Sequence, residues 1–209
     1  MERRIVTIDE IIATFSSHVS EHYPSPKDFR RNFDMLLKGK RERADGGAYS
    51  VSLERNVVFL SSLVSEGDAL IERFLKTDSG EEPGEGGVTA VLEGIEKKAH
   101  ERTARLHGEA FVEGRLGRFE ELRADRAAGG AAYVDKLEFN YRYLMTMRIF
   151  MFEFVSILAA VRSQYSIAAE VDAARKIKSH LELTAHYYLG NVTVDGSGGM
   201  KAGEGEHPG

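Results

Sequence analysis

Residues 131–165 read AAYVDKLEFNYRYLMTMRIFMFEFVSILAAVRSQY and contain no Gly or Pro that would break a helix. Polar side chains recur along this stretch at helical spacing and form one narrow stripe, made of Asp135, Glu138, Arg142, Thr146, Glu153 and Ser156. Aromatic and aliphatic side chains cover most of the remaining circumference, so several neighbouring helices must bury it. The sequence therefore predicts an all-α fold, an antiparallel multi-helix bundle with this long apolar helix at its centre.

The apolar part of this helix, residues 144–161, is long enough to raise the question of a membrane span. Arg148 and Glu153 lie near its middle, and its aromatic side chains are spread along it instead of gathered at the two ends. Both features favour a bundle helix outside the membrane, whose apolar sides can also form an oligomer interface.

Start signals for two further helices precede the central one. Thr7 and Glu10 have the spacing of a capping box, and Ser25 followed by Pro26 places a capping hydroxyl before a proline in the first turn. The predicted helices begin at about residues 8, 26, 49, 88 and 131, with a further one after Tyr165, and Gly46-Gly47 is expected to end the second. The side chains expected to be buried on these helices include Leu36, Val51, Val171 and Leu183.

One domain, residues 1–194, accounts for all the predicted helices. Within it, residues 78–87 read DSGEEPGEGG, an acidic stretch without apolar residues that we expect to form a mobile surface loop. Residues 195–209 are rich in glycine and cannot bury enough apolar area to offset the cost of ordering, so they are expected to be a disordered tail.

The chain of 209 residues has a formal net charge of −5 and no cysteine. This charge gives no overall attraction to nucleic acid or to an anionic membrane, so binding of a polyanion would need a local basic face. The absence of cysteine excludes disulfides, thiol catalysis and thiolate metal sites. The first residues, MERRIVTIDEII, lack the apolar core of a secretory signal, so we expect a cytoplasmic or nuclear protein and leave a mitochondrial address open.

The densest basic stretch is KGKRER, residues 38–43, at the predicted end of the second helix. Clusters of this kind contact phosphates, which makes its cations candidate nucleic-acid-binding residues: Lys38, Lys40, Arg41 and Arg43. The alternative is that these cations offset the dipole at the helix C-terminus and keep a surface solvated.

His18 and His22 lie four residues apart and share one helix face. The sequence lacks the matching carboxylate spacing of a bundle metal site, so we interpret them as exposed histidines and expect no metal and no cofactor. Arg148 lies on an apolar side of the central helix and needs a partner, which could be a carboxylate of another helix, another subunit or a phosphate. For Arg142, the alternative to ligand binding is an internal ion pair, with Glu138 one turn away, that fixes the helix register.

Three stretches are similar to one protein family. Residues 139–158, FNYRYLMTMRIFMFEFVSIL, resemble the long helix of the translin and translin-associated factor X family, with its aromatic-Arg-aromatic start. Residues 180–192, HLELTAHYYLGNV, resemble the family's segment from His-Leu-acid to Asp-Tyr-Leu-x-Gly-Val, and residues 53–63, LERNVVFLSSL, are loosely similar to the second helix of the factor X subunit. The resemblance covers about residues 136–192. Beyond Val194 the chain becomes Gly-rich where the family continues through further helices.

The resemblance implies an oligomeric subunit of the translin type that binds single-stranded RNA or DNA, as a homo-oligomer or with a factor X-like chain. The nucleic-acid-binding run of translin falls here on Lys136, Glu138, Asn140 and Arg142. Lys136 and Arg142 are therefore candidate phosphate contacts, and Tyr141 and Tyr143 are candidate stacking surfaces. Glu138 departs from the family pattern because it replaces a residue that can carry positive charge.

The resemblance also implies that this chain lacks nuclease activity of its own. The acids of the factor X endoribonuclease fall on Met147, on Phe150 and near His186, whereas at least two carboxylates are needed to hold a catalytic divalent metal. Two alternatives remain open. The chain could be a helical scaffold or interaction protein without a nucleic-acid role, or a metal-dependent endoribonuclease subunit of the factor X type.

Overall fold

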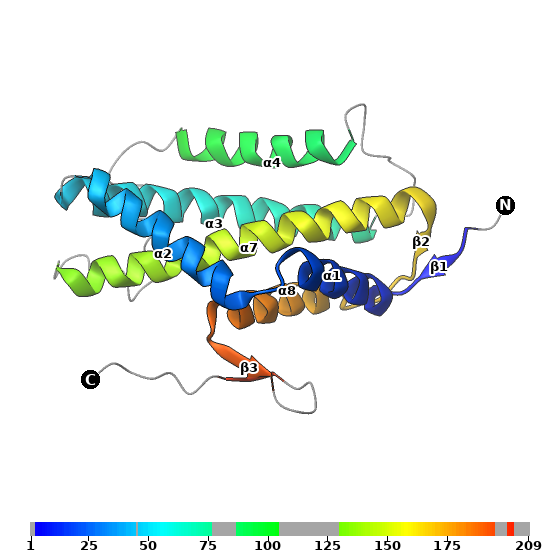
Figure 1. The fold of residues 1–209 in the computed structure, drawn as a ribbon. Coiled ribbons are helices and arrows are strands. Elements are labelled where there is room, and N and C mark those ends of the chain that lie inside the picture. Colours follow the sequence, from blue (N-terminus) through cyan, green and yellow to red (C-terminus); the bar gives the residue numbers. More distant parts are fainter. Residues whose placement is uncertain (1–2, 45, 77–86, 105–129, 195–199, 203–209) are drawn as a thin grey trace.

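The computed structural model describes residues 3–44, 46–76, 87–104, 130–194 and 200–202. These residues are almost entirely helical, which confirms the all-α prediction (Figure 1). The helices are α1 Ile8–His22, α2 Pro26–Arg43, α3 Gly46–Lys76, α4 Gly87–Ala104, α7 Ala131–Gln164 and α8 Ala173–Leu189. The strands are β1 Ile5–Val6, β2 Ser166–Ile167, β3 Val192–Val194 and β4 Met200–Ala202. β1 pairs with β2 in parallel, and β3 pairs with β4 in antiparallel.

The central position of α7 is also confirmed. It contacts α1, α3, α4 and α8, while α2 packs on α8 and α3. Figure 1 shows α3 and α7 lying side by side along most of their length, with α4 on the outer side of α3. The apolar circumference of α7 is thus covered largely within the chain. Of the large apolar side chains in 139–161, Phe139 alone is exposed.

The sequence signals at the first two helix starts operate as expected. The Thr7 hydroxyl accepts the Glu10 backbone N–H at 3.2 Å, and the Glu10 carboxylate accepts the Thr7 backbone N–H at 2.8 Å. The Ser25 hydroxyl accepts the Asp28 backbone N–H at 3.1 Å, with Pro26 in the first turn of α2. These capping hydrogen bonds satisfy amide groups that have no partner inside the helix.

Some sequence predictions are wrong. α2 ends at Arg43, and Gly46-Gly47 begins α3 instead of ending α2, because glycine, although commoner after a helix end, is also accepted at a helix start. Four side chains expected in the core are exposed: Leu36, Val51, Val171 and Leu183. Of the tail predicted to be disordered, residues 200–202 form β4; the rest of it lies outside the described residues, as do most of the loop 78–87 and residues 105–128.

The buried apolar residues form two clusters. The larger, here called the main core, joins α1, α4, α8 and the later parts of α3 and α7 around Phe15, Phe150 and Phe154. The smaller, here called the junction cluster, joins the end of α2, the start of α3 and the start of α7. Its members are Leu37, Tyr49, Leu53, Val57, Val58, Leu60, Tyr133, Leu137, Tyr141 and Leu144. The candidate basic residues lie on or beside the junction cluster, which makes it the part of the fold that positions the site.

Candidate functional site

The end of α2 lies against the start of α7, so the two groups of candidate binding residues meet although about a hundred positions separate them in the sequence. Arg41 of α2 donates to the Glu138 carboxylate of α7 at 2.5 Å. The Nζ atom of Lys40 lies 5.6 Å from the centre of the Tyr141 ring, and Arg142 pairs with Asp34 of α2. Cations of both groups therefore border one surface, here called the α2–α7 face and defined by Asp34, Lys38–Arg43, Lys136 and Arg142.

Glu138 is the polar centre of this junction. Its side chain is only 9% exposed, and besides Arg41 it accepts the Tyr49 hydroxyl at 2.6 Å, with Arg142 at 4.0 Å. Burial, followed by the hydrogen bond to Glu138, raises the pKa of Tyr49 to about 12, and the same carboxylate raises the pKa of the Arg41 guanidinium. This one carboxylate thus joins α2, α3 and α7.

A second tyrosine–glutamate hydrogen bond joins α3 and α7 with the roles of the two helices exchanged. Tyr133 of α7 donates to Glu54 of α3 at 2.5 Å, while Tyr49 of α3 donates to Glu138 of α7. Both helices carry the same short pattern, YSVSLE at 49–54 and YVDKLE at 133–138, and in each the leucine is buried. α3 and α7 run parallel, with both starts in the junction cluster and both later parts in the main core. Each tyrosine therefore reaches towards the C-terminal end of the other helix to meet its glutamate, and the two hydrogen bonds cross. The sequence contained this Tyr-x-x-x-Leu-Glu signal, but sequence reasoning missed it.

The two candidate stacking residues are largely covered. Tyr141 is 4% exposed, so its ring offers no open face to a base. Tyr143 is half-buried and stacks on His186, with ring centres 5.1 Å apart at 28°. Burial, with a further contribution from the Glu182 charge, raises the pKa of Tyr143 to about 12. The geometry therefore supports charge contacts at this face better than stacking.

The remaining cations of the α2–α7 face are solvent-exposed or only loosely held. Lys38 is 77% exposed and lies 3.9 Å from Glu42, Arg43 donates to the Gly39 carbonyl at 2.8 Å, and Lys136 is exposed at the start of α7. α2 as a whole carries seven basic and three acidic side chains in a chain whose formal net charge is −5. Because the net charge is negative, polyanion binding needs a local basic face, and the basic side chains are concentrated on this one helix.

Arg148 pairs with a carboxylate of another helix, one of the three partners that the sequence left open. It pairs with Glu96 of α4 and lies 5.0 Å from the centre of the Phe152 ring, a cation–π distance. A carboxylate of another helix thus accounts for this cation within the chain.

Glu153, the other acid of the α7 stripe, is engaged by two side chains of the α1 region. His18 Nε2 lies 2.8 Å from it, and the Tyr23 hydroxyl donates to it at 3.1 Å. Of the histidine pair, His22 is exposed, whereas the His18 ring is half-buried, with its centre 4.0 Å from that of His22. This corrects our interpretation of His18 as an exposed histidine. Among the described residues, no group of three or more His, Asp or Glu side chains could hold a metal ion.

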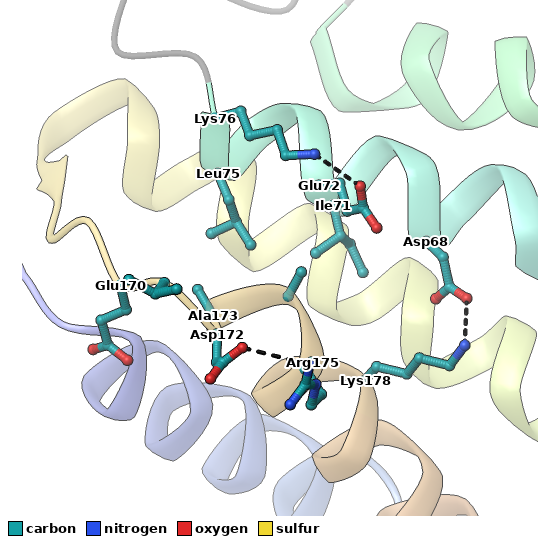
Figure 2. A pocket seen from close by; sticks show the side chains of 12 residues that line it. Asp68, Ile71, Glu72, Leu75, Lys76, Glu170, Asp172, Ala173, Arg175 and Lys178 are labelled. Atoms are coloured by element: carbon teal, nitrogen blue, oxygen red, sulfur yellow. Dashed lines mark hydrogen bonds and ion pairs between the residues drawn. The ribbon is translucent and has the colours of Figure 1, made fainter.

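A cavity of about 490 Å³ lies elsewhere, between the end of α3 and the start of α8 (Figure 2). Most of its charged side chains pair with one another: Asp68 with Lys178 at 3.4 Å, Glu72 with Lys76 at 3.1 Å, and Asp172 with Arg175 at 3.7 Å. Burial raises the pKa of Asp68, although the Lys178 charge opposes this. None of the candidate site residues lines this cavity, and its wall is largely neutralised by its own ion pairs.

Within the described parts of the chain, α7 meets the length and hydropathy criteria for a membrane-spanning helix, and half of its most apolar window is buried inside the chain. Core helices of bundles meet the same criteria. Comparison with protein-family models, with curated proteins and with solved structures gave no match. The resemblance to the translin and translin-associated factor X family therefore stays a prediction, carried by the three stretches quoted above.

Proposed function

We propose that this chain is a translin-like subunit that binds single-stranded RNA or DNA through the α2–α7 face. One observation carries the proposal: the basic stretch 38–43 and the start of α7, selected on separate grounds, lie against each other in the fold. Lys38, Lys40 and Lys136 would contact backbone phosphates, and Arg41 and Arg142 would add charge to the same surface. We further propose that the subunit acts in an assembly, with itself or with a factor X-like chain.

Binding of this kind depends on charge more than on base identity. Tyr141 is buried and Tyr143 is stacked on His186, so the face offers cations in place of aromatic platforms. Phosphate contacts release counterions, so affinity should fall steeply with salt and differ little between sequences.

The test compares two double variants by fluorescence anisotropy with a labelled single-stranded RNA across a salt series. Lys38→Gln with Lys40→Gln should weaken binding and flatten the slope of log K against log salt by about 0.7 for each phosphate that is no longer neutralised by a lysine. Lys97→Gln with Lys98→Gln removes the same charge from exposed positions on α4 and should leave that slope unchanged. Lys136 and Arg142 are substituted in a second round, because Arg142 also pairs with Asp34 and Glu138.

Two results would replace this proposal. If the wild-type chain shows no binding at low salt, the scaffold alternative takes its place. If the chain cleaves the RNA in the presence of magnesium or manganese, and Glu153→Gln abolishes the cleavage, the endoribonuclease alternative is correct. If the chain binds RNA without cleaving it, and the α2 and α4 variants weaken the affinity equally, binding occurs but not at the α2–α7 face.

A further inference from the structure

Two carboxylates contact the arginines of the α2–α7 face, and they differ in burial. The Glu138 side chain is 9% exposed, whereas the Asp34 side chain is 61% exposed. Asp34 belongs to α2 and reaches across to Arg142 of α7, whose own side chain is 28% exposed. The face therefore contains one carboxylate that is fixed in the interior and one that can turn into solvent.

Glu138 cannot leave its position without a large cost. It accepts hydrogen bonds from Tyr49 and Arg41, and Tyr49 is itself a buried member of the junction cluster. Removing this acceptor would leave a buried phenol without a partner. Glu138 thus holds α2, α3 and α7 together.

Asp34 is under no such constraint. Within the described parts of the chain its carboxylate pairs with Arg142, and an ion pair with so exposed a carboxylate contributes little to stability. The Arg142 guanidinium has five donors in a planar fork and binds phosphate oxygens as readily as carboxylate oxygens. A phosphate that approaches this face can therefore take the position of the Asp34 carboxylate at low cost.

We infer, on the basis of the proposed function, that Asp34 occupies the Arg142 guanidinium in the free chain and that a nucleic-acid phosphate replaces it on binding. Asp34 is then a residue that sets affinity, because each binding event must first break its ion pair. The exchange leaves Glu138 in place at 4.0 Å from Arg142, so the arginine keeps its orientation while its exposed partner changes.

The experiment measures Kd and salt slope for labelled single-stranded RNA with the full chain and a set of variants. Asp34→Asn keeps the shape of the side chain and removes its charge, and it should bind about two- to fivefold more tightly than wild type, the equivalent of one exposed ion pair. Its salt slope should match that of the wild type, because Arg142 meets the same phosphate in both complexes and only the competing ion pair of the free chain is lost. Circular dichroism confirms the fold, and Asp34→Ser provides a second variant should Asp34→Asn be unstable.

The matched control is Glu42→Gln, which removes the same charge from the same helix but from a glutamate that pairs only loosely with Lys38. It should give a smaller gain and an unchanged slope. The decisive comparison is Asp34→Asn in the Arg142→Gln background, where the gain should shrink to that of Glu42→Gln because the competing partner is absent.

Three outcomes would overturn the inference. If wild type binds and Asp34→Asn binds no more tightly than Glu42→Gln, Asp34 does not compete with phosphate, although the proposed function stands. If the gain persists in full without Arg142, Asp34 acts only through its general negative field. If no variant binds RNA at low salt, the proposed function fails, and the inference fails with it.

Discussion

The main core and the junction cluster share two long helices, yet they use different chemistry. In the main core, α7 contributes phenyl rings that meet Phe15 edge to face, with ring centres 6.3 and 5.4 Å away for Phe150 and Phe154. In the junction cluster, α3 and α7 bury Glu54 and Glu138, the two buried carboxylates among the described residues. Apolar contacts give stability without strong directional preference, whereas buried hydrogen-bonded pairs tolerate few alternative arrangements. One half of the bundle thus supplies most of the burial, and the other half constrains how the helices align.

The largest effect should come from removing a ring in the main core. Phe154→Ala should lower the free energy of unfolding by about 3–5 kcal/mol, because it removes a fully buried ring and leaves a cavity. Phe139→Ala on the same helix is the control; Phe139 is 50% exposed, and its loss should change stability by less than about 0.5 kcal/mol. Urea denaturation measures both.

The control also tests assembly. If Phe139→Ala proves costly, and light scattering shows that the wild type is an oligomer that the variant disrupts, a partner chain covers Phe139. A wild-type monomer at micromolar concentration would remove the oligomer from the proposal. A cost below about 1 kcal/mol for Phe154→Ala would contradict the role assigned to the main core.

An intermediate effect is expected in the junction cluster. Glu138→Leu should cost about 1–3 kcal/mol, because the buried Tyr49 hydroxyl loses its acceptor. Tyr49→Phe combined with Glu138→Leu should recover much of that loss, since both polar partners are then gone. A double-mutant cycle from denaturation curves gives the coupling energy. Strictly additive losses would show that the short distance between these side chains contributes nothing to stability.

The smallest expected effect is a pH dependence of stability that arises in the main core. His180 lies beside Phe15 in the main core, and burial lowers its pKa. Below about pH 6.5 the unfolded chain therefore binds a proton at this histidine more readily than the folded chain does. The contribution of His180 to the free energy of unfolding is fully present above that pH and is lost as the pH drops towards the folded-state pKa. His180→Gln should remove this component of the acid loss, whereas His22→Gln, at an exposed position, should retain it. The measurement compares the urea midpoints of wild type and both variants at about pH 5 and pH 7. An equal loss of stability at the lower pH in wild type and His180→Gln would contradict this assignment.

Much of the secondary structure was predictable because its signals are local. The capping box at Thr7 and the Ser25-Pro26 start depend on residues within one turn, and the central helix is marked by an unbroken apolar pattern. Gly46-Gly47 misled the prediction because a glycine pair can precede a helix as well as follow one. Val51 was expected to be buried from its apolar character alone, but its direction on α3 decides its exposure.

The candidate site was less predictable because it depends on contacts between distant segments. Arg41 and Glu138 lie 97 positions apart, and nothing local to either residue indicates that they touch. The family resemblance selected Arg142, yet it could not show that Asp34 would pair with it. The two Tyr-x-x-x-Leu-Glu stretches were visible in the sequence, but their meaning becomes clear only when the two helices lie side by side in parallel.

That reciprocal arrangement has a mechanical consequence. A displacement of α3 along α7 by one helical turn is about 5.4 Å, and because the two Tyr–Glu hydrogen bonds cross, movement in either direction would pull one of them apart. The two helices are therefore resistant to shear at this end of the bundle, while a small rotation about the paired residues preserves both hydrogen bonds. Any large motion between α3 and α7 should accordingly pivot near residues 49–54 and 133–138, with its greatest amplitude at the opposite end.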